Sequence, residues 1–295
     1  MGRSNERSDF SDDRAPSPHA APPPRERVPE HEAFSKDVHS RSQIVGEPRT
    51  PYRDRDRSYS LRASEIHTLL ELGTFRSLDT EALAEFAYGG NSARMEQDLK
   101  NLARQSLIAR RNLEAPQGER VQILALTKTG QRFLANQRLT IMGRPIYHGF
   151  VKPKEARHDA TLYRVYQQAA RQIMRDGGKS LRVALDFELK QKVNRELAKL
   201  GPEQNNPERK FEIAQAHGLR MINGRTAVPD LQVEYETPEG GMARVNIELA
   251  TKHYRPRQME AKAQAGFSLY APSGDANRLR RVLNDREITA EILSI

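Results

Sequence analysis

The chain has 295 residues, which is room for two ordinary domains, and it contains neither cysteine nor tryptophan. Without cysteine, a disulfide framework and a thiolate metal site are excluded, and the composition suits a cytoplasmic protein. The formal net charge is +9 at pH 7, and because residues 1–59 hold equal numbers of acidic and basic side chains, the excess lies in residues 60–295. A charge excess in the folded part favours an anionic partner such as nucleic acid, although mildly basic proteins without one are common. No run approaches the roughly 18 apolar residues that span a bilayer, and the N-terminus lacks a signal-peptide core, so no membrane partner is expected.

Residues 1–59 are predicted to be a disordered tail. They contain eight of the 17 prolines and few large apolar residues, so burial could not offset the entropy lost on ordering. Between Arg53 and Arg57 the charge alternates in sign, which is typical of a solvated lead-in. A basic arm that grips phosphates is the alternative, which the interleaved aspartates weaken.

Residues 60–140 are predicted to form a first domain of helices followed by a hairpin. A helix over about residues 62–72 is expected to stop at Gly73, and Asp79 can cap a second helix.

The third helix, over residues 91–104, has the clearest pattern of this domain. Asn91 can cap it, and Met95, Leu99 and Leu102 recur at i, i+4 and i+7, so they should share one buried face. Its polar faces hold the residues that we expect to reach bases or phosphates: Ser92, Arg94, Gln97, Lys100, Asn101 and Arg104.

A hairpin over about residues 107–111 and 121–126 follows, and Arg110, Arg111 and Arg120 on it are the expected phosphate contacts. The run Leu124-Ala-Leu-Thr-Lys-Thr-Gly130 then starts a fourth helix, in a pattern that closes many bacterial winged-helix domains. This order of elements predicts a winged helix-turn-helix that binds double-stranded DNA, with its third helix in the major groove. A winged helix used only for protein contacts is the alternative.

Residues 141–154 are predicted to be a linker, and residues 155–295 a second domain. Helical and strand patterns alternate in it, so the whole chain is expected to be α+β, with a central mixed sheet in the second domain. The expected elements are a helix ending at Gly177-Gly178, a strand at 181–187, helices to 200 and over 207–215, a hairpin at 228–252, a helix at 257–264, a strand at 267–271, a helix capped by Asp275, and a strand at 288–295.

The hairpin at 228–252 can carry chemistry. If its turn centres near residues 239–240, Asp230 lies opposite Glu248 or Ala250, and Lys252 points to the same face. Two carboxylates converging across adjacent strands can hold Mg²⁺, and a nearby lysine can stabilise phosphoryl charge. The alternative, which spacing alone favours, is that this face is merely the solvated side of a hairpin.

The pattern resembles the PD-(D/E)xK nuclease fold. Pro229-Asp230 matches its first motif and Glu248 the acid of its second, but the usual lysine position is Ala250. Lys252 and Lys262 are the candidates to replace that lysine, and Glu155 or Asp159 could supply a further acid.

A winged helix, the pair His158-Asp159, a PD strand and an acid-bearing strand together resemble the replication-relaxation family, over roughly residues 60–275. That resemblance implies a DNA-binding accessory protein of plasmids or mobile elements, acting in replication, relaxation or mobilisation, with a nuclease-like domain that is degenerate in many members. It places His158 and Asp159 beside Asp230 and Glu248 as candidate catalytic residues. The alternative for His158 is a helix-start residue that packs or caps.

Binding without catalysis is therefore the first expectation, and it requires no cofactor. A metal-dependent DNA nuclease that uses Mg²⁺ at Asp230 and Glu248 is the second. The third is a transcriptional regulator or a scaffold that recruits a relaxase or a replication initiator. The sequence leaves homodimer formation open.

Overall fold

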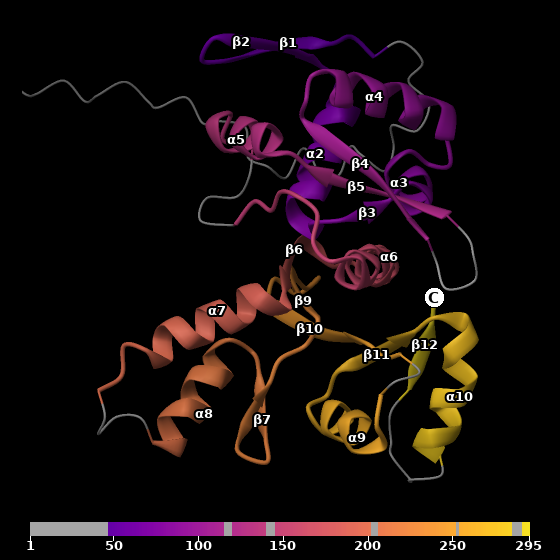
Figure 1. Cartoon of the computed structure of the whole chain (residues 1–295). Coiled ribbons are helices and arrows are strands. Elements are labelled where there is room, and N and C mark those ends of the chain that lie inside the picture. Colours follow the sequence, from indigo (N-terminus) through magenta and orange to yellow (C-terminus); the bar gives the residue numbers. More distant parts are fainter. Residues whose placement is uncertain (1–46, 115–119, 140–144, 202–205, 252–253, 285–290) are drawn as a thin grey trace, which may run out of the picture.

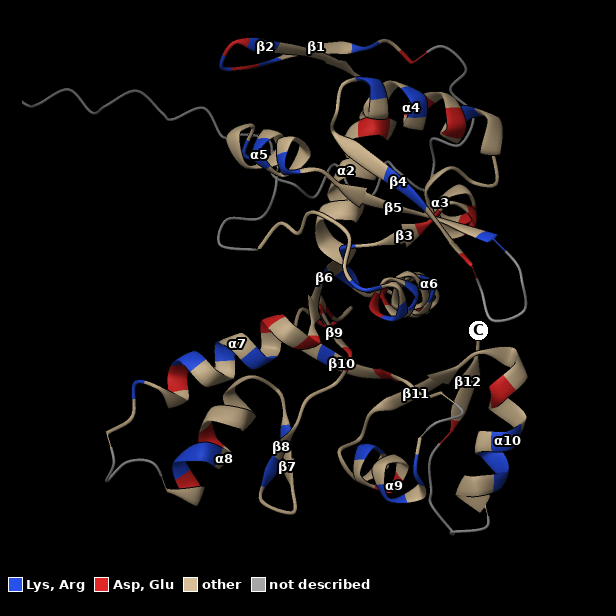
Figure 2. Ribbon diagram, in the orientation of Figure 1, with Lys and Arg blue, Asp and Glu red and all other residues tan. Residues whose placement is uncertain are grey.

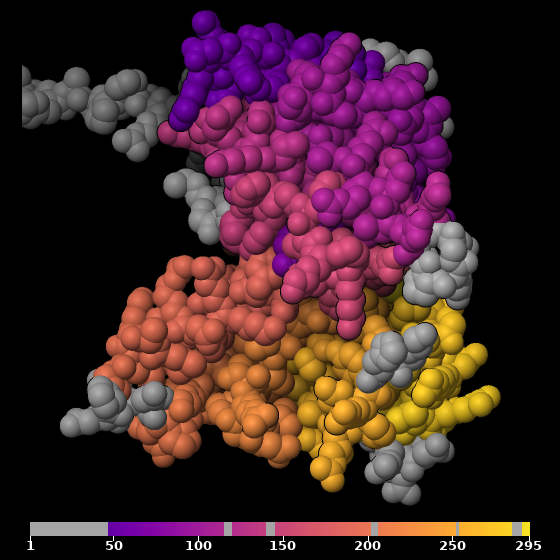
Figure 3. All heavy atoms as spheres, viewed as in Figure 1, coloured from indigo at the N-terminus to yellow at the C-terminus, as the bar shows by residue number. Residues whose placement is uncertain are grey.

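The structure is a computed structural model that describes residues 47–114, 120–139, 145–201, 206–251, 254–284 and 291–295. It is α+β, with two halves of mixed helices and strands and the long helix α6 (Pro153–Arg175) between them (Figure 1). The space-filling view shows the same division, with the first half above and the second half below (Figure 3). The predictions for residues 1–46, for Lys252 and for the turn at 115–119 lie outside the described residues.

The described part of the first half consists of a ribbon, helices and a small antiparallel sheet. Its elements are β1 (Thr50–Asp54), β2 (Arg57–Leu61), α2 (Ala63–Phe75), β3 (Leu78–Asp79), α3 (Thr80–Ala87), α4 (Ser92–Arg104), β4 (Ile108–Glu114), β5 (Arg120–Leu126) and α5 (Lys128–Asn136). The sheet has the order β3–β5–β4, and β1 pairs with β2. The predicted succession of three helices, a hairpin and a fourth helix is confirmed.

Short polar side chains start three of these helices. Asp79, Asn91 and Thr127 each accept a hydrogen bond from the amide three residues further on. Each bond satisfies a first-turn donor that has no partner within the helix. The predicted caps at Asp79 and Asn91 are therefore confirmed.

Close packing explains why two positions of the first half are occupied by glycine. The predicted helix stop at Gly73 is wrong, because α2 continues to Phe75. A Cβ at Gly73 would lie 3.0 Å from Ile146 Cγ2, so close packing favours glycine there. At Gly130 a Cβ would lie 2.2 Å from the Leu107 carbonyl oxygen, which no side chain could accommodate. The glycine that closes the Leu124–Gly130 motif thus lets α5 pack directly on the start of the hairpin.

The prediction of disorder is wrong for residues 47–59, because β1 and β2 form an ordered ribbon that runs from Thr50 to Leu61. Tyr59 and Leu61 are buried. The ring centroids of Tyr59 and Phe133 lie 5.0 Å apart, with the rings packed edge to face. The composition of the whole tail concealed these few apolar side chains, which alternate along β2 and therefore face one side. The ribbon lies over α4 and α5 (Figures 1 and 3).

The described part of the second half contains a mixed five-stranded sheet and its covering helices. After α6 come β6 (Lys179–Leu185), α7 (Asp186–Leu197), α8 (Pro207–Ala216), β7 (Arg220–Ile222), β8 (Arg225–Ala227), β9 (Leu231–Glu236), β10 (Met242–Leu249), α9 (Pro256–Gln264), β11 (Ser268–Ala271), α10 (Ser273–Asn284) and β12 (Ile292–Ser294). The strand order is β12–β11–β10–β9–β6, with β10, β11 and β12 parallel and the other pairs antiparallel.

The β9–β10 hairpin has the predicted register and the predicted apolar face. Val233 lies opposite Val245, and Leu231 opposite Ile247. The other face is buried at the end that holds Glu248 and open towards the turn, where Arg244 is exposed, so the solvated alternative holds for only part of it. Gln232 is buried there and donates to the carbonyl oxygen of His217 at 3.1 Å. Both faces of β9 and β10 are therefore covered at the end of the hairpin that holds Gln232 and Glu248.

Smaller differences occur along the second half. The β7–β8 pair was not predicted, and β9 begins at Leu231, later than expected. Helix α10 begins at Ser273, so Asp275 lies in its first turn and is not its cap. The final strand covers the last part of the predicted range, whose residues 288–290 lie outside the described residues.

Helix α6 packs against both halves. The Phe75 and Tyr163 rings lie 5.2 Å apart, and Arg76 makes two hydrogen bonds to Asp159, at 2.9 and 2.7 Å. One continuous apolar core runs from Tyr59 in the ribbon to Tyr270 in β11. The predicted boundary at residue 155 therefore assigns to the second domain a helix that both halves share. Within the described ranges, every helix is too short or too polar to cross a bilayer.

Candidate functional site

Helix α4 presents one exposed polar stripe. Gln97, Lys100 and Arg104 lie at i, i+3 and i+7 and are all exposed, as is Ser92 at the start of the helix. The stripe contains two cations and no acidic residue. Met95, Leu99 and Leu102 are buried beneath it, which confirms the predicted core face.

The neighbouring stripe of α4 is covered by the β1–β2 ribbon. Asn101 is 6% exposed, and its Nδ2 donates to the Ser60 carbonyl oxygen at 3.2 Å and to Glu65 at 2.8 Å. Arg94 is largely buried between Glu47, at 3.3 Å, and Asp98, at 3.4 Å. The prediction that Asn101 lies on the open face is therefore wrong, and the charge of Arg94 is already neutralised within the chain. Helical spacing could not reveal this, since the covering segment lies some 40 residues upstream.

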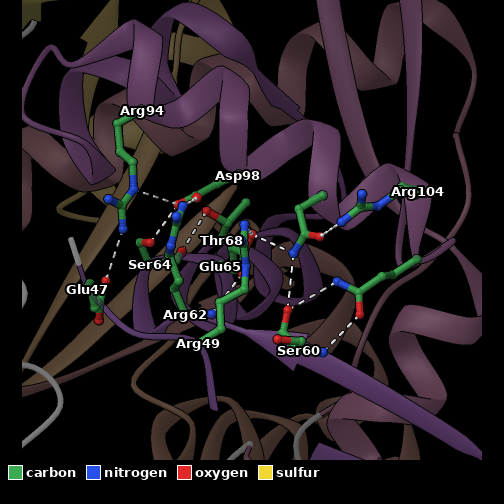
Figure 4. A network of polar contacts seen from close by, with 12 residues as sticks. Glu47, Arg49, Ser60, Arg62, Ser64, Glu65, Thr68, Arg94, Asp98 and Arg104 are labelled. Atoms are coloured by element: carbon green, nitrogen blue, oxygen red, sulfur yellow. Dashed lines mark hydrogen bonds and ion pairs between the residues drawn. The ribbon is translucent and has the colours of Figure 1, made fainter. Parts of the chain in front are cut away.

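Asp98 lies at the centre of this arrangement, which we call the α4 network (Arg62, Glu65, Arg94, Asp98 and Asn101). Asp98 is fully buried, and it accepts from Arg62 Nη1 at 2.7 Å and from Ser64 Oγ at 2.6 Å. Tyr88 also donates to it, and burial followed by the Asp98 charge raises the pKa of the Tyr88 hydroxyl. These bonds fix the base of the ribbon against α4 (Figure 4).

The β4–β5 hairpin divides the predicted phosphate contacts between two faces. Arg110 Nη1 donates to Glu96 of α4 at 2.8 Å, so part of its charge is neutralised. Arg111, the next residue, points to the opposite face and stacks over the Phe150 ring at 4.3 Å. Arg120 is exposed on the Arg110 face, directly opposite Glu114. The three arginines therefore do not form one surface.

The β9 and β10 strands bring Asp230 and Glu248 together, as the register predicts. The Asp230 amide donates to Glu248 Oε2 at 3.2 Å, and Asp230 Oδ2 accepts from the Leu249 amide at 2.9 Å. Glu248 is 2% exposed and Asp230 19%. This pair is the centre of the carboxylate cluster, which also contains His158, Tyr254 and Lys262.

Lys262 supplies the cation of this cluster from α9. Its Nζ lies 2.9 Å from Glu248 Oε1 and donates to the Val228 carbonyl oxygen at 2.8 Å. The Tyr254 hydroxyl donates to the same Glu248 oxygen at 2.5 Å. Of the two candidate lysines, Lys262 therefore reaches the acid, and Lys252 lies outside the described residues. Tyr254 was missed, because nothing in its local sequence marks it.

His158 and Asp159 point in different directions. His158 Nε2 lies 3.5 Å from Asp230 Oδ1, whereas Asp159 is buried against Arg76 at the junction of the halves. Burial lowers the pKa of His158, but the hydrogen bond and charge of Asp230 outweigh it and the pKa is raised. Burial raises the pKa of Asp159 in spite of Arg76. His158 is therefore part of the carboxylate cluster, whereas Asp159 is part of the contact between the two halves.

The two close carboxylates of Asp230 and Glu248 favour a positive charge beside them. Burial and then the charge of Asp230 raise the pKa of Glu248, while Lys262 opposes them. Asp230 and Glu248 offer oxygen ligands of the kind that Mg²⁺ takes. Each of their four oxygens, however, already has a protein partner, and within the described residues no three acidic, histidine or cysteine side chains are grouped as a metal site. An incoming ion would need to displace one of these partners and keep water ligands.

Comparisons of the chain with family models, with curated proteins and with solved structures find no match.

Proposed function

We propose that the protein is a non-catalytic DNA-binding accessory protein of plasmid or mobile-element replication, relaxation or mobilisation. In this proposal the first half is a winged helix-turn-helix, with α4 as its recognition helix. The second half is a nuclease-like domain whose acidic pair is held by the protein's own donors.

The exposed stripe of α4 carries the proposal. Gln97 and Lys100 can reach base edges or phosphates directly, and Arg104 can do so with the donors that its bond to Asn101 Oδ1 leaves free. The nearest carboxylate, Glu96, is paired with Arg110. The charge map shows Lys and Arg on α4, on the β1–β2 ribbon and on α5 in the first half (Figure 2). The order of helices and hairpin, and the excess of basic residues outside the tail, support the same reading.

The test is a titration of fluorescent duplex DNA at several salt concentrations. Each phosphate contact that a cation makes contributes about 0.9 to the slope of log affinity against log salt. The double variant Lys100→Ala/Arg104→Ala should therefore lower the slope by about one to two units and weaken binding.

Lys192→Ala/Lys199→Ala is the matched control, since it removes the same charge from exposed positions on and just after α7. It should bind as the unaltered protein does. The proposal is contradicted if the unaltered protein fails to retard any duplex at low salt, or if the two double variants behave alike.

The carboxylate cluster favours one other candidate function, a Mg²⁺-dependent nuclease. Its support is the approach of Lys262 to Glu248 beside Asp230. This candidate expects nicking of supercoiled plasmid with Mg²⁺ or Mn²⁺ that is lost in Asp230→Asn. Intact plasmid with both metals removes it and leaves the binding proposal untouched.

A further inference from the structure

The tip of the β1–β2 ribbon carries more free positive charge than its sequence implies. Arg53, Arg55 and Arg57 are exposed, and two aspartates alternate with them. Asp54, however, is 5% exposed and points inward. Its Oδ1 accepts from Asn136 Nδ2 at 2.7 Å, and its Oδ2 lies 3.7 Å from Arg132. Of the residues from 53 to 57, Asp56 alone therefore presents an acid to solvent.

Helix α5 continues this basic surface. Lys128, Arg132 and Arg138, on and just after the helix, are exposed, and the helix contains no acidic residue. The ribbon is fixed to α5 by Asp54 and by a hydrogen bond from Gln137 Nε2 to the Arg53 carbonyl oxygen at 2.8 Å. The tip and α5 thus form one surface, which we call the ribbon–α5 patch. Blue segments, which mark Lys and Arg, occur on both elements in Figure 2.

The patch lies beside the exposed stripe of α4. Gln105, directly after α4, bonds to both the amide and the carbonyl oxygen of Ser60 in β2. Arg57 is three residues from Ser60 along an extended strand, which is roughly 10 Å. The tip therefore begins within one major-groove width, roughly 12 Å, of the C-terminal end of α4.

The β4–β5 hairpin lacks such a surface. Arg110 is paired with Glu96, Arg111 stacks on the opposite face, and Arg120 stands opposite Glu114. The ribbon side of α4 therefore presents more unpaired basic side chains than the β4–β5 hairpin does.

We propose that the ribbon–α5 patch is a second nucleic-acid binding site, which holds the phosphate backbone of a duplex whose groove receives α4. Its ligand is a run of phosphodiester groups. The guanidinium groups of Arg55, in the turn, and Arg57, which lies opposite Asp54 and so on the side of α5, are its donors, whereas Arg53 points to the other face of the ribbon. Arginine suits this task because its planar fork bonds two phosphate oxygens at once. The site rests on the proposed DNA-binding function and adds to it a contact that does not depend on base sequence.

The experiment compares Arg55→Asn/Arg57→Ala with the unaltered full-length protein in the same salt titration. Asparagine is chosen at residue 55 because its φ of 52° is left-handed, a conformation that asparagine tolerates. Thermal unfolding should be unchanged, since both side chains are exposed. The salt slope should fall by about two units. The loss in affinity should be similar for duplexes of unrelated sequence.

Asp56→Asn is the opposing variant, since it removes the exposed acid of the tip. It should bind duplex DNA more tightly than the unaltered protein at low salt. An unchanged slope in Arg55→Asn/Arg57→Ala, together with a reduced slope in Lys100→Ala/Arg104→Ala, overturns the second site and leaves the proposed function standing. Absence of duplex binding by the unaltered protein overturns both.

Discussion

The molecule contains two clusters of charged side chains that differ in how their carboxylates are satisfied. In the α4 network, Asp98 and Glu65 are fully buried and bonded to donors from three segments of the chain (Figure 4). In the carboxylate cluster, Glu248 is buried, but Asp230 and its partner His158 are 19% and 38% exposed. The carboxylates of the first cluster are closed to solvent, whereas the second cluster is open to solvent at Asp230 and His158.

This difference separates a structural role from a functional one. A buried polar network with every oxygen bonded to arginine, serine and asparagine holds one geometry, here the ribbon on α4. A half-open pair beside a lysine and a histidine can exchange a partner for a ligand without unfolding the chain. The distinction predicts which substitutions lower stability and which alter function.

Removal of the Asp98 carboxylate should have the largest effect. Asp98→Ala leaves Arg62 and Arg94 without their buried partner, and breaking a buried pair lowers the free energy of unfolding by about 3–5 kcal/mol. Urea denaturation followed by circular dichroism measures this loss. Asp56→Asn, on the exposed tip, should change stability by less than about 0.5 kcal/mol. Similar values for the two variants would contradict the closed character of the network.

Much of the fold follows from local signals in the sequence. The caps at Asp79 and Asn91 act within one helical turn, so local sequence predicts them. The approach of Asp230 to Glu248 is equally predictable, because a tight turn sets the register of an antiparallel hairpin.

What could not be predicted depends on segments distant in the chain. Asn101 has the spacing of an exposed residue, and only the path of β2 buries it. Lys262 and Tyr254 reach Glu248 because the crossover from β10 to β11 returns α9 over the strand ends. Arg111 was grouped with Arg110 because both are basic, although successive strand residues face opposite sides.

Loss of the Lys262 charge should have the next largest effect. Lys262→Met leaves the buried Glu248 carboxylate with Tyr254 and an amide as donors, and a lost bond to a charged group lowers stability by about 1.5–3 kcal/mol. The pKa of Glu248 is already raised by burial and Asp230, and loss of Lys262 should raise it further. The destabilisation should therefore be small at acid pH, where the carboxyl is protonated, and should grow as the pH rises through that pKa. Chemical denaturation at several pH values measures it, and a deficit independent of pH would contradict this prediction.

Arg76 tests the junction between the two halves of the molecule, which lies outside both clusters. Arg76→Lys keeps the charge but loses the paired bonds to Asp159, which is 3% exposed, so stability should fall by about 1–2 kcal/mol. Because Asp159 belongs to neither cluster, duplex binding should be unchanged once the protein is folded. Thermal unfolding and the salt titration together check this. A normal melting temperature with altered DNA affinity would instead place Arg76 in the binding surface.

Substitution of His158 should have the smallest effect on stability, and its pKa reports directly on the solvent-exposed side of the carboxylate cluster. The pKa of His158 is raised in the folded protein, so the pair with Asp230 stabilises the fold fully below the ordinary histidine value of about 6.5. That stabilisation is lost as the pH rises through the folded pKa. Since His158 is 38% exposed, solvent screening should keep its contribution below about 1 kcal/mol. His158→Gln should therefore be less stable than the unaltered protein at pH 5.5 and nearly equal to it at pH 8.5, and nuclear magnetic resonance titration of the ring gives the pKa itself. A lowered pKa would mean that burial outweighs Asp230, which would make the cluster closed like the α4 network.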